Sequence, residues 1–248
     1  MSSAVKINKS GIDFSQALLP LVKVGMPPRD LLMPALEKVL YGGMIAEGDD
    51  VYHFEAEFAR IFRLPLALGT SSGTSALHIA LLLADVVPGD EVITTSMTAE
   101  PTNTVILQCG AKPVFADIDS ETGNLDPKSV ESLVTSRTRA IVVVHYAGFP
   151  ANLGELRRIA DHYGIQLIED CAHALGANYS GASIGTIGDF AIFSLQAIKH
   201  MTTVDGGILT MRDGSKATKA RKLRWFGMAK GVPRTEVDIE HVGFKYNM

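Results

Sequence analysis

The sequence predicts an α/β domain in which helices cover both faces of a mostly parallel β-sheet, in three α/β/α layers. From about residue 65, short β-rich runs alternate with amphipathic stretches of helical length. The runs 141–144 and 167–168 are continuously apolar, which is typical of strands buried on both faces. Turn residues such as Pro88-Gly89-Asp90 separate the segments, so repeated β-α-β units are expected.

The elements expected before the sheet are two helices. Residues 30–41 form a helical stretch that Gly42-Gly43 would end, and residues 50–62 form a second one that begins at an aspartate cap. Because they precede the alternating part of the chain, we expect them to pack on the outside of the domain or on a partner.

The expected elements of the sheet domain follow these two helices in the sequence. After residue 181 the pattern changes to two short segments, 189–194 and 207–211, and then to a basic helix at 216–226. The remaining expected strands are 91–95, 113–116, 140–145 and 166–169, and the helices between them are 75–84, 101–109, 127–134 and 153–163.

Composition and charge argue against several classes of protein. Of the 248 residues, 46% are apolar and 20% charged, which is too apolar for a disordered chain, and the net charge of −4 does not favour nucleic-acid binding. Cys109 and Cys171 form no CxxC pair or Cys/His cluster, which favours a reducing compartment. No secretory segment is visible at the start, and the apolar runs are too short to span a bilayer. We therefore expect a cytoplasmic protein without membrane segments.

Three strand-to-helix junctions carry unusual residues, and open α/β sheets bind ligands at such junctions. The first junction, 69–75, is a run of glycine and small hydroxyl residues that leads into an apolar helix. Free amides and the helix dipole at such a position can bind a phosphate group. The spacing matches neither a Walker A loop nor GxGxxG, and an ordinary helix cap is the alternative.

The second junction places Glu169, Asp170 and His173 at the end of an apolar strand. An aspartate there can be buried only if it meets a cation or several donors, and the protonated nitrogen of a pyridine ring is one such cation. Two alternatives stay open: Asp170 as the cap of a helix with a bystander histidine beside it, or the segment as a metal site. The metal has less support because no second pair of ligands accompanies it.

The third junction contains Lys199 in an otherwise uncharged stretch, followed by Gly206-Gly207. A desolvated lysine with a lowered pKa is a nucleophile suited to Schiff-base chemistry, although most lysines are solvated surface groups. A phosphate cradle, a carboxylate for a pyridinium nitrogen and a Schiff-base lysine are together what pyridoxal 5′-phosphate (PLP) requires.

From about Pro34 to the last residue, the chain resembles the DegT/DnrJ/EryC1/StrS family of PLP-dependent sugar-nucleotide aminotransferases, which have the aspartate-aminotransferase fold. The motifs that carry the resemblance are, in order, SSGTSALHIAL, GDEVI, GAKPVFADID, NLDP, RTRAIVVVH, IEDCAHALGA, GDFAIFSLQAIKHMTTVDGGIL and GFKYNM.

The resemblance implies roles for individual residues. Lys199 matches the catalytic Schiff-base lysine, which also moves the proton between the substrate and the cofactor, and Asp170 matches the carboxylate that pairs with the pyridinium nitrogen. His173 matches the place of a glutamine or histidine that lies near the ring hydroxyl in the family. Phosphate contacts are implied for Thr74, Ser75 and Ser194, and Lys245 would reach the phosphate bound by the other subunit.

Two positions depart from the family pattern. Members often carry an aromatic residue that stacks on the cofactor ring, where this chain has Met97 or Ala99. The closing motif commonly has asparagine where this chain has Lys245, whose positive charge could serve the same phosphate.

The resemblance further implies a homodimer with shared active sites and a reaction in two halves. An amino-acid donor, usually glutamate, loads the cofactor, which then aminates a nucleotide-linked keto-sugar, as in polysaccharide biosynthesis. Alternatives are a sugar dehydratase, in which histidine replaces the lysine, and a non-catalytic regulatory member. His200 is adjacent to Lys199, but the FSxxxxK register places the lysine at the family position and favours transamination.

The same resemblance divides the chain into three parts. Residues 1–33 would be an N-terminal segment and residues 34–240 the cofactor-binding large domain. Residues 241–248 would begin a small C-terminal domain of which the chain lacks the remainder.

Overall fold

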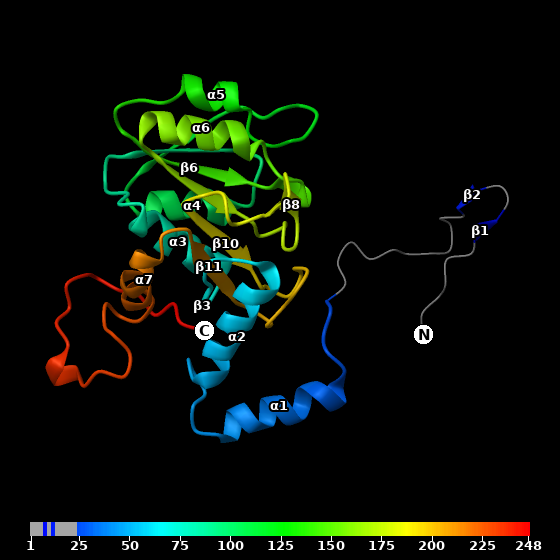
Figure 1. Ribbon diagram of the computed structural model, residues 1–248, viewed down its shortest axis with the longest axis vertical. Helices are drawn as coiled ribbons and strands as arrows, with labels where there is room; N and C mark the ends of the chain where they lie inside the picture. Colours follow the sequence, from blue (N-terminus) through cyan, green and yellow to red (C-terminus); the bar gives the residue numbers. More distant parts are fainter. Residues whose placement is uncertain (1–6, 9–10, 13–23) are drawn as a thin grey trace.

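The computed structural model describes residues 7–8, 11–12 and 24–248. A seven-stranded sheet lies at its centre, in the order β3-β11-β10-β7-β6-β4-β5, and helices cover it (Figure 1). The strands are β3 (Leu68–Thr70), β4 (Glu91–Thr94), β5 (Lys112–Phe115), β6 (Thr138–Val144), β7 (Gln166–Asp170), β10 (Phe190–Ser194) and β11 (Gly207–Met211). The predicted α/β class with a mostly parallel sheet is confirmed.

The helices around this sheet are α2 (Asp49–Phe62), α3 (Gly73–Leu83), α4 (Glu100–Gln108), α5 (Pro127–Ser132), α6 (Leu153–Tyr163) and α7 (Ala217–Arg224). Two apolar clusters separate them into layers. One cluster joins residues of α3, α4 and α7 to one face of the sheet, and the other joins residues of α2, α5 and α6 to the opposite face. The central strands are therefore buried on both sides, as the continuous apolar runs 141–144 and 167–168 predict, whereas the edge strand β5 is partly exposed.

Strand direction decides where functional residues gather. Pairs β4–β5, β4–β6, β6–β7 and β7–β10 are parallel, whereas β11 runs antiparallel to both β10 and β3. The carboxyl ends of β4, β6, β7 and β10 consequently lie along one edge of the sheet. The segments that follow these strands meet there, and this edge is where such folds bind ligands.

Several boundaries differ from the sequence expectation. Strand β3 was not expected because three residues are too few to show a pattern, and the small hairpin β8 (Asn178–Tyr179) and β9 (Ala182–Ser183) was not expected either. The predicted aspartate cap of α2 is wrong: Gly48 is the N-cap, without a side-chain hydrogen bond, and Asp49 and Asp50 lie in the first turn. Their charges favour the helix there through its dipole.

The first helix, α1 (Arg29–Tyr41), lies apart from the sheet domain (Figure 1). None of its residues is buried, and Leu31, Leu36 and Leu40 are exposed. The remaining short elements are β1 (Ile7–Asn8), β2 (Gly11–Ile12) and three 3-10 turns, Tyr146–Gly148, Gly214–Lys216 and Arg234–Glu236. In the described part of the chain, no helix has the length and apolarity needed to cross a membrane.

The end of the chain packs back onto the sheet domain. The carbonyl of Tyr246 accepts a hydrogen bond from the amide of Ser71 at 2.8 Å. Beneath it, the buried Arg224 guanidinium bonds Glu55 Oε1 at 2.5 Å and Glu47 Oε1 at 2.6 Å. This ion cluster ties α7 to the α2 region and must be kept intact, since removing one partner leaves a buried charge uncompensated.

Candidate active site

A pocket of about 600 Å³ opens at the carboxyl edge of the sheet. It lies between the N-terminus of α3, the ends of β7 and β10, and the loops that follow β4 and β6. Five of the seven predicted site residues line it: Thr74, Asp170, His173, Ser194 and Lys199. The three junctions singled out in the sequence therefore meet at one place.

One wall of the pocket is the first turn of α3. Ser72 caps this helix, since its Oγ accepts a hydrogen bond from the amide of Ser75 at 3.0 Å. Gly73 and Thr74 line the pocket, and amides in a first helical turn have no acceptor within the helix. A Cβ on Gly73 would lie 3.1 Å from Ser194 Cβ, so the turn and Ser194 are in close contact. The wall therefore offers amides, hydroxyl groups and a helix dipole to an anion.

This close approach also depends on Gly207, at the start of β11. A Cβ at this position would lie 2.4 Å from the backbone carbon of Ser72. Only glycine allows the α3 turn and β11 to come this near, so Gly207 shapes this wall of the pocket without lining it.

Ser75 does not line the pocket. Its hydroxyl lies 2.9 Å from both Ser71 Oγ and Ser72 Oγ, in a small hydroxyl cluster behind the helix turn. The structure thus brings Thr74 to the pocket and places Ser75 where it supports the cap.

Asp170 ends strand β7 at the floor of the pocket and is 6% exposed. Its Oδ2 accepts a hydrogen bond from Thr102 Oγ1 at 2.9 Å, and its Oδ1 accepts one from the amide of Ala172 at 3.1 Å. An ionised carboxylate offers about four acceptor sites, so two remain for a ligand. Asp170 is thus fixed in place by the protein and still able to pair with a cation.

Lys199 lies in the same pocket on the segment after β10. Burial lowers the pKa of its amine, and the charge of Asp170 opposes this only in part. Within the described residues its Nζ has no hydrogen-bond or ion-pair partner. A lowered pKa makes the neutral, nucleophilic form of an amine more accessible.

His173 follows Asp170 at the rim of the pocket and is exposed. Partial burial of its ring and the charge of Lys199 lower the pKa of His173, and Asp170 acts in the opposite direction. A neutral imidazole at this position can donate or accept a hydrogen bond.

Lys245 lies away from this pocket. Its Nζ bonds Asn247 Oδ1 at 2.5 Å and stands 4.8 Å from the centre of the Trp225 ring. The structure therefore does not bring Lys245 to the other predicted residues within one chain, and its role toward a second subunit stays a prediction.

Sequence reasoning missed some residues of the pocket. Tyr146 follows β6 at the same edge and could have been found by the junction rule applied to the other strands. Thr102 lies in the first turn of α4 and gave no sequence signal, because its role depends on a contact with a distant strand. Met97 and Ala99, the two residues named above at the expected ring-stacking position, do line the pocket.

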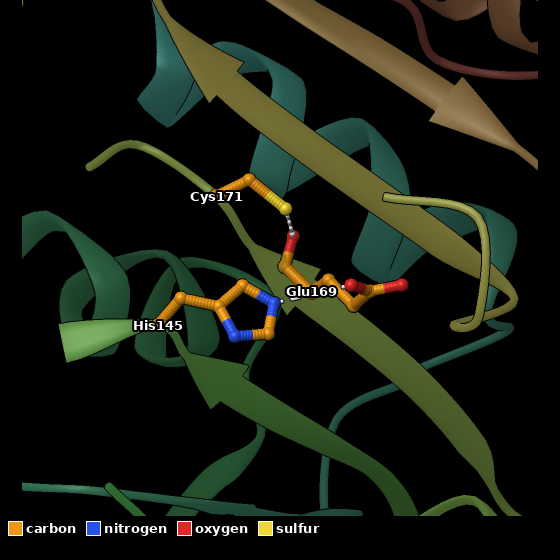
Figure 2. Close-up of side chains that lie close together, drawn as sticks. All are labelled: His145, Glu169 and Cys171. Carbon is orange, nitrogen blue, oxygen red and sulfur yellow. Dashed lines mark hydrogen bonds and ion pairs between the residues drawn. The ribbon is translucent and has the colours of Figure 1, made fainter. Parts of the chain in front are cut away.

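A second cluster contains His145 and the two sequence neighbours of Asp170, Glu169 and Cys171, all buried (Figure 2). Its ligand atoms lie within 4.8 Å of one another, which raises the possibility of a metal site. The hydrogen bonds argue against it. His145 Nδ1 accepts from the amide of Ala151 at 3.1 Å, so Nε2 carries the proton and faces Glu169 Oε2 at 3.1 Å. Both imidazole nitrogens are therefore already engaged.

Glu169 and Cys171 are also poorly suited to bind a metal. Glu169 also accepts three bonds from the amides of Gly185, Ile187 and Gly188, at 3.0, 3.0 and 2.6 Å. Burial raises the pKa of the Cys171 thiol well above its usual value, which disfavours the thiolate a metal needs. The cluster is a hydrogen-bonded support for the sheet edge.

Comparison with known proteins identifies the same family as the sequence motifs. The sequence model of the DegT/DnrJ/EryC1/StrS aminotransferase family matches residues 29–248. The sugar aminotransferase CalS13 from Micromonospora echinospora is 35% identical, with a TM-score of 0.87, over 92% of this chain and 64% of that one. AtS13 from Actinomadura melliaura is 36% identical, with a TM-score of 0.88, over 93% and 64%.

A third similar structure, Spr1654 from Streptococcus pneumoniae in its PLP form, is 27% identical with a TM-score of 0.84, over 93% of this chain and 63% of that one. The chain thus spans less than two thirds of the length of these structures.

Proposed function

Because the chain belongs to the DegT/DnrJ/EryC1/StrS aminotransferase family, we propose that it is a PLP-dependent aminotransferase that acts on a nucleotide-linked keto-sugar. The observation that carries this proposal is the meeting of Lys199 and Asp170 in one pocket beside the N-terminus of α3.

The residues present fit the cofactor at three separate points. The α3 turn with Thr74 and the Ser194 hydroxyl would hold the phosphate. Asp170, buried yet with acceptor capacity to spare, would pair with the protonated ring nitrogen. Lys199 would bind the aldehyde carbon, and His173 would lie near the ring hydroxyl. When bound, PLP supplies an electron sink for the charge that develops on the amino-acid carbon.

The chain's own groups then account for proton movement. An amine with a lowered pKa, like that of Lys199, can accept the proton from the substrate carbon and return it at a neighbouring atom. Asp170 would favour the protonated ring nitrogen by placing a negative charge beside it. Apolar side chains of Leu77, Val144 and Ile192 line the same pocket and would reduce the access of water to the reacting atoms.

For the substrates we propose an amino-acid donor, glutamate in the first instance, and a nucleotide-linked keto-sugar as acceptor. CalS13 is named a sugar aminotransferase, which supports this class of acceptor.

We further propose a homodimer with shared active sites. Two features support it: α1 exposes apolar side chains without burying any residue, and Lys245 is exposed outside its own chain's pocket. In a dimer, Lys245 would approach the phosphate bound by the other subunit.

The experiment that tests the function is reconstitution with PLP followed by borohydride reduction and peptide mapping. We expect a visible absorbance band and a covalent adduct on Lys199 in the parent chain. Lys199→Ala should lose both, whereas Lys219→Ala, which changes a lysine on α7 that does not line the pocket, should keep both. Absence of the adduct from the parent would contradict the cofactor assignment.

The second half of the test uses substrates. Glutamate or glutamine should bleach the visible band, and a panel of nucleotide-linked keto-sugars should restore it for the true acceptor. If no amino donor changes the spectrum, transamination is wrong and the dehydratase alternative gains support.

A further inference from the structure

Asp170 is held in position by a threonine on another element. Thr102 lies in the first turn of α4, buried at 4% exposure, and its hydroxyl donates to Asp170 Oδ2 at 2.9 Å across 68 positions of sequence. The amide of Ala172 holds the other carboxylate oxygen at 3.1 Å. These two donors fix the plane of the carboxylate, since a carboxylate held at both oxygens cannot rotate freely.

The hydroxyl of Thr102 is in turn oriented by Thr98. The two Oγ1 atoms lie 2.9 Å apart, and a threonine has a single hydroxyl proton. Because Thr102 gives its proton to the carboxylate, Thr98 must donate to Thr102. The hydrogen bonds therefore run in one direction, from Thr98 through Thr102 to Asp170.

A separate pair of hydrogen bonds fixes the position of α4, and with it the position of the Thr102 hydroxyl. Asn103 Nδ2 donates to the carbonyl of Thr95 at 3.0 Å, and Thr94 Oγ1 donates to Asn103 Oδ1 at 2.9 Å. Asn103 thus anchors the first turn of α4 to the end of β4, and Thr102 reaches from that anchored turn toward β7.

We propose that Thr102 is a positioning residue: it holds the Asp170 carboxylate in the orientation that pairs with a cationic ring nitrogen in the pocket. This inference rests on the proposed function, because the ring nitrogen belongs to the proposed cofactor. Thr102 acts through Asp170 and has no chemical step of its own.

The test compares Thr102→Val, which removes the hydroxyl at nearly constant volume, with Thr102→Ser, which keeps it. Thr138→Val is the matched control. Thr138 is also buried, and its hydroxyl accepts a hydrogen bond from the amide of Thr135 at 2.9 Å, but it lies at the opposite end of the sheet from the pocket. Each variant is crystallised without ligand, and its dissociation constant for PLP is measured by absorbance.

In Thr102→Val we expect the Asp170 carboxylate to leave its position and PLP to bind about tenfold more weakly, the effect of one hydrogen bond to a charged group. Thr102→Ser and Thr138→Val should keep the carboxylate in place and bind PLP within about twofold of the parent. If Thr102→Val gives too little folded protein, Thr102→Ala removes the same hydroxyl without adding a methyl group.

An unmoved carboxylate in Thr102→Val would overturn the inference, as would an equal loss of PLP binding in Thr138→Val. If the parent chain fails to bind PLP at all, the proposed function fails, and the ligand-free crystal structures still decide whether Thr102 positions Asp170.

Discussion

Glu169 and Asp170 are neighbours on β7, and their side chains leave the sheet on opposite faces. Glu169 accepts four hydrogen bonds, from His145 and from three backbone amides of the segment 185–188. Asp170 accepts two and faces the pocket. Both carboxylates are buried, so burial alone does not distinguish a structural acid from a functional one. The two are distinguished by whether the carboxylate keeps unused acceptor sites beside a cavity.

The strongest test of this difference is Asp170→Asn. The amide cannot provide a negative charge to a ring nitrogen, so we expect the transamination rate to fall by about 100-fold or more, the equivalent of a lost charge-assisted hydrogen bond. The free energy of unfolding should change by no more than about 1 kcal/mol, because the side chain keeps its shape and one acceptor. Kinetics with glutamate and urea denaturation measure the two effects. A large loss of stability would place Asp170 with Glu169 as a structural acid.

The reciprocal test is Glu169→Gln. Each carboxylate oxygen receives at least one backbone amide, so the new NH₂ group must face an N–H donor whichever way it is turned. We expect the free energy of unfolding to fall by about 3 kcal/mol, as for a buried charged group that loses its partners. Urea denaturation monitors the change. The protein that remains folded should bind PLP with unchanged affinity, and a selective loss of PLP binding would contradict the comparison.

A pH titration sharpens the same contrast. Burial alone would raise the pKa of Glu169, but the hydrogen bonds from His145 and from the amides of Gly188 and Gly185 outweigh it and hold the pKa below 4.5. A lowered folded-state pKa contributes stability above the unfolded value, and this contribution is lost as the pH falls through the folded pKa. The stability gap between the parent and Glu169→Gln should be constant above pH 4.5 and shrink below it. Denaturation curves at a series of pH values check this, and a gap that widens in acid would contradict it.

The smallest predicted effect concerns strain on the pocket side of the sheet. Val204 has φ +75°, a value that β-branched residues rarely adopt, and it is 68% exposed beside Asp205 of the pocket. Val204→Gly should raise the free energy of unfolding by about 1 kcal/mol, because the relieved strain exceeds the added chain entropy. Val87→Gly is the control: Val87 is also exposed, at 51%, but has no positive φ, so this change should be neutral or destabilising in the same thermal melt. A destabilised Val204→Gly would show that the loop is not strained.

Much of the fold followed from local sequence patterns. Helix α6 and strand β11 have the predicted bounds, and the other predicted helices and strands of the sheet lie within a few residues of expectation. Strand β3 was missed because so short a strand forms only through pairing with the distant strand β11. The β8–β9 hairpin was missed because strands of two residues are too short to show a pattern. Propensity acts over a few residues, so it cannot report a pairing set by the rest of the chain.

The sequence by itself determined the class of fold, the family, and the three junctions from which the pocket is built, since these depend on local patterns and on motifs in order along the chain. Only the tertiary structure decided which side chains face the cavity. Thr74 lines the pocket, whereas Ser75 supports the helix cap. Glu169 accepts four hydrogen bonds from the protein, whereas Asp170 accepts two and keeps acceptor sites for a ligand. The tertiary structure also brought Thr102 to Asp170 from another element. These outcomes depend on the direction of each side chain and on contacts between distant segments, and both are fixed only when the helices pack on the sheet.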